Sequence, residues 1–109
     1  MRKISLEAAK AFAYNYSYSG NNTKVITAPT IMTLFRNKIA YKKDGKVFIC
    51  LCGWATKTTL ERLNTLLAQY GFHDYKLRIK EGVCYYKDKY IDSSKEYSLN
   101  LGTQAIEEA

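Results

Sequence analysis

The sequence has few residues that break or crosslink a chain: one proline, six glycines and three cysteines among 109 residues. This scarcity excludes a low-complexity or collagen-like chain. An odd number of cysteines in a chain without an export signal indicates reduced thiols rather than a disulfide framework. The length implies one domain, and 47% hydrophobic residues supply its core. We therefore expect a single globular domain.

Long apolar runs are also missing. No stretch approaches the roughly 20 apolar residues of a membrane span. The first seven residues, Met1-Arg2-Lys3-Ile4-Ser5-Leu6-Glu7, lack the apolar centre of a signal peptide. We expect an intracellular protein that makes no membrane contact.

Motifs for catalysis and cofactor binding are not found. The sequence contains no phosphate-binding glycine loop, no G-x-S-x-G and no H-E-x-x-H. Its one histidine, His73, follows a glycine that ends a predicted helix, and Asp44, Glu81 and Asp88 fall in hairpin turns or at strand ends. We expect a protein that is not an enzyme and uses no cofactor.

A zinc site is the alternative that the cysteines leave open. Cys50 and Cys52 lie two apart on a predicted strand and so share a face, and Cys84 and His73 complete a set of four zinc ligand types. The spacing differs from the paired cysteines of structural zinc sites, and free cysteine is usually buried. Core packing is the preferred interpretation.

Two helices are predicted. Ser5 is a candidate cap for a helix over 5–16, in which apolar residues recur with a period near 3.6. Thr58-Thr59-Leu60-Glu61 matches a capping box, and a leucine stripe then runs to Gly71, which predicts a helix over 59–70.

The strands come in pairs. Segments 23–27 and 30–35 are rich in β-branched residues on either side of Pro29, and Asp44-Gly45 and Glu81-Gly82 each separate two apolar runs, as two-residue hairpin turns do. The first of these hairpins pairs Tyr41 with Phe48 and Ile39 with Cys50 on one face, and Ala40 with Ile49 on the other. The second puts Leu77, Ile79, Cys84 and Tyr86 on a core face, and Lys76, Arg78, Lys80, Val83, Tyr85 and Lys87 on a basic face.

The resulting fold class is α+β. The order α-β-β-β-α-β-β predicts a mainly antiparallel sheet with two helices on one face, and the apolar run after Lys46 predicts a central strand. The domain would cover 1–92, with an edge strand at 89–92. Residues 93–109 are interpreted as a polar, partly disordered tail.

The basic residues point to a partner. Lysine and arginine number 17 against 10 acidic residues, and seven of these cations but only Asp44 among the acids lie in 24–57. Such clusters neutralise phosphates, and a tyrosine among them can stack on bases. A solubilising surface is the alternative for the charge, and half-buried packing is the alternative for Tyr85.

Residues 53–59 form a second candidate feature. Trp54 and Lys57 lie where the second helix begins, and the N-terminus of a helix attracts anions. Equally, Trp54 could close the core while Thr58 only caps the helix. We expect Trp54 to be partly buried with one ring edge accessible.

Four segments within residues 22–64 stand out as motifs: Asn22-Thr23-Lys24-Val25, then Leu34-Phe35-Arg36-Asn37-Lys38-Ile39-Ala40, then Asp44-Gly45-Lys46-Val47, and finally Gly53-Trp54 with 56–64. In these segments the chain resembles a family of short proteins encoded by tailed bacteriophages. It implies a phage origin and a setting in the host cytoplasm or the virion, but no reaction and no catalytic residue. Phe35-Arg36 stands where the family pattern has a short, often glycine-containing turn.

Two hypotheses follow. The first is a non-enzymatic DNA- or RNA-binding accessory protein; the second is an interaction module for a host or virion protein, with aromatics ringed by basic residues. Arg62 and Asn64 join the candidate site from the resembling segment, although their helix face could simply bond back to the preceding loop. The candidate nucleic-acid-binding residues are Arg36, Lys38, Lys42, Lys46, Trp54, Lys57, Arg62, Asn64, Arg78, Lys80, Tyr85 and Lys87.

Overall fold

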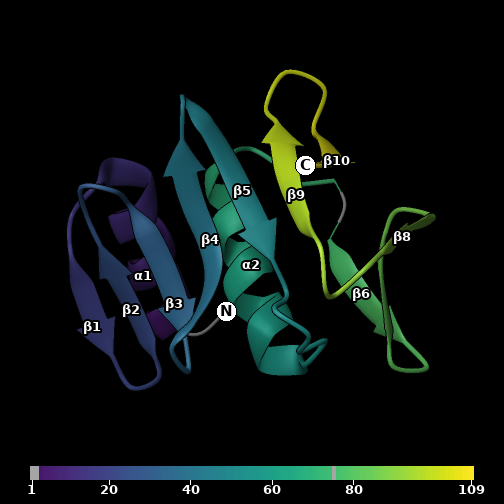
Figure 1. Cartoon of the computed structure of the whole chain (residues 1–109), viewed down its shortest axis with the longest axis horizontal. Coiled ribbons are helices and arrows are strands. Elements are labelled where there is room, and N and C mark those ends of the chain that lie inside the picture. Colours follow the sequence, from purple (N-terminus) through teal and green to yellow (C-terminus); the bar gives the residue numbers. More distant parts are fainter. Residues whose placement is uncertain (1–2, 75) are drawn as a thin grey trace.

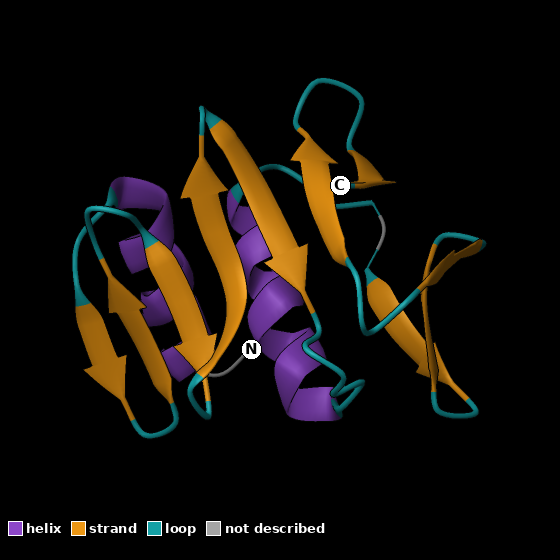
Figure 2. Cartoon of the chain, in the orientation of Figure 1, coloured by secondary structure: helices purple, strands orange, loops and turns teal. Residues whose placement is uncertain are grey.

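Two helices lie against one face of a seven-stranded antiparallel sheet, and a separate three-stranded sheet stands beside it (Figures 1 and 2). The computed structural model describes residues 3–74 and 76–109. Helix α1 is Lys3–Tyr14 and helix α2 is Lys57–Gln69. The α+β class, the antiparallel sheet and the placement of both helices on one face are confirmed.

The large sheet has the order β1-β2-β3-β4-β5-β9-β10, and the small sheet has the order β6-β7-β8. β5 therefore lies inside the large sheet, as its two apolar faces predict. The strands of the large sheet are β1 (Tyr18–Gly20), β2 (Thr23–Ile26), β3 (Ile31–Leu34), β4 (Asn37–Lys43), β5 (Lys46–Cys50), β9 (Glu96–Asn100) and β10 (Ala105–Glu108). Those of the small sheet are β6 (Leu77–Lys80), β7 (Val83–Tyr86) and β8 (Lys89–Ile91).

The predicted hairpin registers are largely confirmed. Tyr41 pairs with Phe48 and Ala40 with Ile49. One part is wrong: Ile39 does not share the face of Tyr41. The β3–β4 register shifts at this point, so that Thr33 pairs with Lys38 while Met32 pairs with Ala40. Ile39 is the extra residue of this bulge and is buried together with Ala40.

The second hairpin follows the predicted register throughout, with Leu77 opposite Tyr86 and Ile79 opposite Cys84. Leu77, Cys84 and Tyr86 are buried and Arg78 and Lys80 are exposed, while Ile79, Val83 and Tyr85 are half-buried. Because a slip of one residue would exchange the faces, the buried and the exposed residues confirm the register, and the half-buried Tyr85 fits its interpretation as a packing residue.

The C-terminal segment differs from the interpretation as a tail. β9 pairs with β5 and β10 pairs with β9, so residues 93–109 extend the large sheet. Tyr97, Leu99 and Ile106 are buried. Tyr97 and Leu99 alternate with polar residues at the period of two that a half-buried strand requires. The predicted edge strand at 89–92 corresponds to β8 and belongs to the small sheet.

Both helix starts also differ from the prediction. Ser5 lies inside α1 rather than at its cap, and it is buried together with Ala8, Ala9, Ala11 and Phe12. These residues form the buried face of α1, which packs against α2. The N-cap of α2 is Thr56, not Thr58, because Thr56 Oγ1 accepts a hydrogen bond from the backbone N–H of Thr59 at 3.2 Å.

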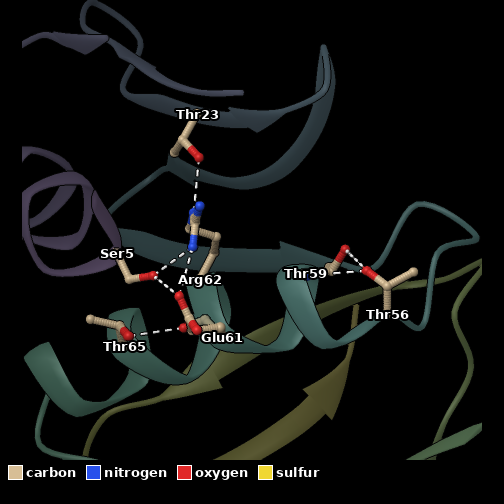
Figure 3. A network of polar contacts seen from close by, with 7 residues as sticks. All are labelled: Ser5, Thr23, Thr56, Thr59, Glu61, Arg62 and Thr65. Atoms are coloured by element: carbon tan, nitrogen blue, oxygen red, sulfur yellow. Dashed lines mark hydrogen bonds and ion pairs between the residues drawn. The ribbon is translucent and has the colours of Figure 1, made fainter. Parts of the chain in front are cut away.

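A buried polar network joins α1, α2 and β2 (Figure 3). Arg62 is 2% exposed. Its Nε donates to Thr23 Oγ1 at 2.9 Å, and its Nη1 donates to Ser5 Oγ at 2.7 Å and to Glu61 Oε1 at 2.8 Å. Ser5 Oγ in turn donates to Glu61 Oε1 at 2.7 Å. The charge of Arg62 is therefore satisfied inside the protein, where it holds three elements together.

Candidate functional site

An apolar ridge crosses the face of the large sheet that the helices leave open. Ile26 pairs with Ile31, Ile31 with Tyr41, and Tyr41 with Phe48. Paired residues of antiparallel strands point to the same side of a sheet, so these four side chains form one continuous row from β2 to β5. Ile26 is 45% exposed, and the other three are partly buried. We call this row the ridge.

Lysines flank the ridge on both sides. On one side the neighbouring row runs from Lys24 through Thr33 to Lys38, and on the other side Lys43 pairs with Lys46. All four lysines are exposed. The open face of β2–β5 is thus an apolar strip between two cationic edges, and we call this surface the ridge face.

Tyr41 and Phe48 form the centre of the ridge face. Their rings are stacked, with centroids 5.0 Å apart and planes inclined by 12°. Lys38 Nζ lies 4.4 Å from the centroid of the Tyr41 ring. Tyr41 Oη donates to Glu96 Oε1 at 2.7 Å, and burial together with this carboxylate raises the pKa of Tyr41 to about 12. The tyrosine is held in place, while the neighbour of Phe48 on β9 is only the small Ser98.

The charge of the open face changes sign across the sheet. Beyond Phe48 the row continues through Ser98 to Glu107, and Glu96 pairs with Cys50. The cations therefore gather over β2–β5 and the carboxylates over β9 and β10. A polyanion would be attracted to the first half of the face and repelled by the second.

Two of the predicted binding residues, Lys38 and Lys46, lie on the ridge face. Lys42 does not, because its side chain turns towards the end of α1. Its Nζ donates to the carbonyl oxygen of Ala13 at 3.1 Å and to Asn15 Oδ1 at 2.9 Å, and burial lowers its pKa. Lys42 therefore binds the C-terminal end of a helix, where cations are stabilising.

Sequence reasoning missed Lys24, Lys43, Tyr41 and Phe48 as members of one surface. The signal was available in part, because the predicted hairpin already placed Tyr41 opposite Phe48 and paired Lys43 with Lys46. The contribution of Lys24 depends on the pairing of β2 with β3. The connection between β2 and β3 contains no Asn-Gly or Asp-Gly turn, so the register of this pairing cannot be predicted from the sequence.

Arg62 and Asn64 are corrections to the predicted site. The side chain of Arg62 is buried and hydrogen-bonded within the polar network, so it cannot reach a ligand at the surface. Asn64 Nδ2 donates to the carbonyl oxygen of Leu77 at 3.0 Å, and Asn64 Oδ1 accepts from the N–H of Leu77 at 2.8 Å. This amide docks β6 onto α2 by imitating a backbone pairing.

The basic face of the small sheet is a second surface, separate from the ridge face. A shallow groove of about 710 Å³ contains Arg78, Lys80, Tyr85 and Lys87, as the register predicts. It also contains the carboxylates of Glu81 and Asp88, which offset part of the positive charge. Acidic residues also lie near the ridge face, with Asp44 in the turn between Lys43 and Lys46 and Glu96 bonded to Tyr41. We favour the ridge face because only there do lysines flank both sides of a continuous apolar row.

The remaining predicted residues, Arg36, Trp54 and Lys57, gather at one end of the large sheet. Trp54 is 60% exposed, so the interpretation of this residue as a core plug is wrong, and more of its ring is accessible than the single edge that we expected. It lines a pocket of about 370 Å³ between the β3–β4 turn and the β5–α2 loop. Arg36 and Lys57 are exposed next to residues that line the same pocket.

The cysteines do not gather into a metal-binding cluster in the part of the chain that the structure describes. No three His, Cys, Asp or Glu side chains come together there. Cys84 is buried in the small sheet, while Cys52 lies after β5 and its Sγ donates to the carbonyl oxygen of Lys38 at 2.9 Å. Burial raises the pKa of Cys52 to about 12 and that of Cys84 to about 11. Both are held as thiols rather than thiolates.

These shifts predict that the protein loses stability in alkaline solution. Burial also raises the pKa of Tyr70 to about 12. When the pH exceeds the ordinary value of a thiol, 9.0, the unfolded chain releases protons that the folded chain retains, so the free energy of unfolding falls. Lys42, whose pKa burial lowers, acts in the opposite direction but is a single group. We expect urea midpoints to decrease from about pH 8.5 to pH 10.5.

A double variant provides the control for this prediction. Cys52→Ala with Cys84→Ala removes two of the raised groups, so its midpoint should depend less steeply on pH than that of the wild type. A wild-type midpoint that rises or stays constant through this range would contradict the burial of these groups.

The fold and the ridge face together define a small basic α+β protein with an open, lysine-flanked sheet surface. The family model of the Kyanoviridae Gp96 protein matches residues 1–104, so the chain belongs to this family of phage proteins. The match covers far more of the chain than the resemblance over 22–64 and confirms its phage origin. No curated protein and no solved structure matches the chain. Within residues 3–74 and 76–109, neither helix is long and apolar enough to cross a membrane.

Proposed function

We propose that the protein binds single-stranded nucleic acid, without catalysing a reaction, on the ridge face. The observation that carries the proposal is the ridge itself, an apolar and aromatic row flanked on both sides by lysines. Surfaces that bind single strands without sequence preference combine a cationic track for the backbone with aromatic rings for the bases. The host cytoplasm is the setting in which a phage protein would meet such strands.

The four lysines supply the electrostatic part of the binding. Lys24 and Lys38 border one side of the ridge and Lys43 and Lys46 the other, so phosphates can be neutralised along either edge. Neutralised phosphates release condensed counterions, which makes the affinity fall as salt rises. Lys38 is exposed, and its contact with the Tyr41 ring leaves its ammonium group open to a phosphate oxygen.

The stacked pair supplies the contacts to bases. The Phe48 ring stacks on Tyr41, and both side chains are only partly buried on the open face. An unpaired base can stack on the accessible part of this pair. In a duplex the bases are already stacked on one another, so this surface favours a single strand.

A salt titration tests the proposal. A short labelled single-stranded oligonucleotide is titrated with the protein, and its fluorescence anisotropy is followed at several salt concentrations. With about four phosphates neutralised, the logarithm of the affinity should fall with a slope near −3, or about 50-fold between roughly 50 and 200 mM salt. No binding at the lower concentration would overturn the proposal and favour the interaction module for a host or virion protein.

Charge-matched variants locate the surface. Lys43→Ala with Lys46→Ala should weaken binding and reduce the salt slope by about 1.4. Lys3→Ala with Lys10→Ala removes the same charge from α1 and should leave the slope unchanged. Arg78→Ala with Lys80→Ala removes it from the small sheet. If either control pair lowered the slope as much as the ridge pair does, the assignment to the ridge face would be wrong.

A further inference from the structure

The pocket at the end of the large sheet has two aromatic walls and an apolar floor. Phe35 in the β3–β4 turn is 61% exposed, and Trp54 in the β5–α2 loop is 60% exposed. The pocket of about 370 Å³ lies within the size range of small-ligand sites. Its lining consists of Leu34, Phe35, Asn37, Ile39, Leu51, Trp54, Thr56 and Thr59.

Both walls stand on anchored backbone. The N–H of Phe35 donates to the carbonyl oxygen of Asn22 at 2.9 Å. In the β5–α2 loop, the N–H of Gly53 donates to the carbonyl oxygen of Ser93 at 2.7 Å. The N–H of Trp54 donates to the carbonyl oxygen of Leu51 at 2.9 Å. The rings are therefore exposed but not carried by loose loops, which lowers the entropic cost of holding a ligand between them.

Polar groups at the pocket suit the edge of a planar heterocycle. The side-chain amide of Asn37 offers a donor and an acceptor, and it makes no hydrogen bond to any residue that the structure describes. Thr56 Oγ1, by contrast, is occupied by the N–H and hydroxyl of Thr59. Amide side chains bind base edges through this donor and acceptor pair.

Three cations lie close to the pocket in the sequence. Arg36, Lys38 and Lys57 are exposed, and each is the sequence neighbour of a lining residue. Two acidic residues lie nearby, Asp44 in the turn at the opposite end of the β4–β5 hairpin and Glu96, which pairs with Cys50 and bonds to Tyr41. An anionic ligand with a flat apolar part therefore complements the pocket better than an apolar side chain alone.

The pocket lies next to the ridge face, at the end of the sheet and on the side of the helices. Asn37, which lines the pocket, pairs with the buried Leu34, whereas its neighbour Lys38 pairs with Thr33 on the open face. β4 runs from this point to Lys43 at the far side of the ridge. A strand that follows β4 along the lysines reaches the pocket by passing around the end of the sheet.

We propose that the pocket receives one unstacked base of the bound strand between Phe35 and Trp54, with the adjoining phosphates against Arg36, Lys38 and Lys57. This inference rests on the proposed function and adds a specific base-binding position to it. The pocket unites segments that are distant in the chain, both of which contributed to the resemblance over 22–64.

Fluorescence of Trp54 provides the test, because it is the only tryptophan in the chain. Titration of the wild type with an unlabelled single-stranded oligonucleotide should quench its emission as the base stacks on the indole. Anisotropy of a labelled oligonucleotide, measured in parallel, reports binding independently of the pocket. The two curves should give the same affinity.

Two variants complete the experiment. Phe35→Ala removes one wall but keeps the reporter, and Trp54→Ala removes the other; each should lower the affinity between about 5-fold and 100-fold. Because Trp54 is mostly exposed, its loss should leave the melting temperature nearly unchanged. Tyr90→Ala, which removes a 55% exposed aromatic from the small sheet, should leave both affinity and melting temperature as they are.

The outcomes separate this inference from the proposed function. Oligonucleotide binding with the expected salt slope, but with unchanged Trp54 emission and unchanged affinity of both wall variants, would overturn the base pocket and leave the ridge face intact. A lack of any anisotropy change at low salt would overturn the proposed function, and the base pocket with it. Quenching by an apolar peptide but not by the oligonucleotide would identify the pocket as a site for a protein side chain.

Discussion

Replacement of Arg62 by alanine is expected to lower the free energy of unfolding by about 2–5 kcal/mol, because it removes a large buried side chain and leaves its buried hydrogen-bond partners unsatisfied. The guanidinium donates three hydrogen bonds, to Thr23, Ser5 and Glu61. Truncation leaves the hydroxyls of Ser5 and Thr23, each 1% exposed, without this donor and opens a cavity between α1, α2 and β2. Domains of this size have about 5–15 kcal/mol in total, so a large part of the stability would be lost.

Urea unfolding of Arg62→Ala beside Arg78→Ala measures the effect. Arg78 is exposed on the small sheet, and its loss should change the free energy by no more than about 0.5 kcal/mol. A triple variant, Ser5→Ala with Thr23→Val and Arg62→Met, removes the buried hydroxyls together with the guanidinium and leaves only Glu61, whose side chain is 31% exposed and can turn to water. It should recover part of the loss, because no buried hydroxyl is then left unsatisfied. If Arg62→Ala were as stable as Arg78→Ala, the network would not hold the elements together.

The sequence predicted what is local. The Asp-Gly and Glu-Gly turns gave the registers of β4–β5 and β6–β7, because both residues of each turn need positive φ, as Asp44, Gly45, Glu81 and Gly82 all have. The separation of Arg78 and Lys80 from Leu77 and Cys84 followed from those registers alone.

Long-range arrangements could not be read in the same way. Ser5 has the properties of an N-cap, and only the approach of Arg62 from another helix explains why it is buried inside α1. The bulge at Ile39 depends on how β3 meets β4. Residues 93–109 were assigned to a tail because they are polar, yet β5 offers an edge on which their few apolar residues can pair.

In the candidate site, too, local pairings were predicted and long-range ones were not. Tyr41 and Phe48 were predicted to be partners, but the ridge needs Ile26 and Ile31 from another hairpin. Likewise, Phe35 and Trp54 come from separate loops and share a pocket only in the folded chain. Lys42 and Arg62 were misassigned because a cation that binds a helix end or is buried in a polar network has the same sequence signature as one that binds phosphate.

In the turn that contains Phe35, substitutions are expected to raise the free energy of unfolding, whereas Arg62→Ala lowers it. Phe35 and Arg36 are the two central residues of the β3–β4 turn, and their φ angles are 50° and 70°. This left-handed conformation costs most residues roughly 1–2 kcal/mol, whereas asparagine and glycine adopt it readily. Phe35→Asn with Arg36→Gly should therefore raise the free energy of unfolding by about 1–3 kcal/mol.

The same double variant should bind oligonucleotides less well, because it loses one aromatic wall of the pocket and one of its cations. Strain that is retained in a turn and coupled to an exposed aromatic ring is typical of functional sites. Thermal unfolding and anisotropy on one preparation measure both effects, and the melting temperature should rise by several degrees.

Single substitutions separate the two causes. Arg36→Gly relieves part of the strain but keeps Phe35, so it should be more stable than the wild type and still quench Trp54 on binding. Phe35→Ala keeps a Cβ at positive φ, so it should bind weakly without any gain in stability. If the double variant were no more stable than the wild type, the turn would store no strain. If it were more stable and bound oligonucleotides as tightly as before, Phe35 would have no part in the site.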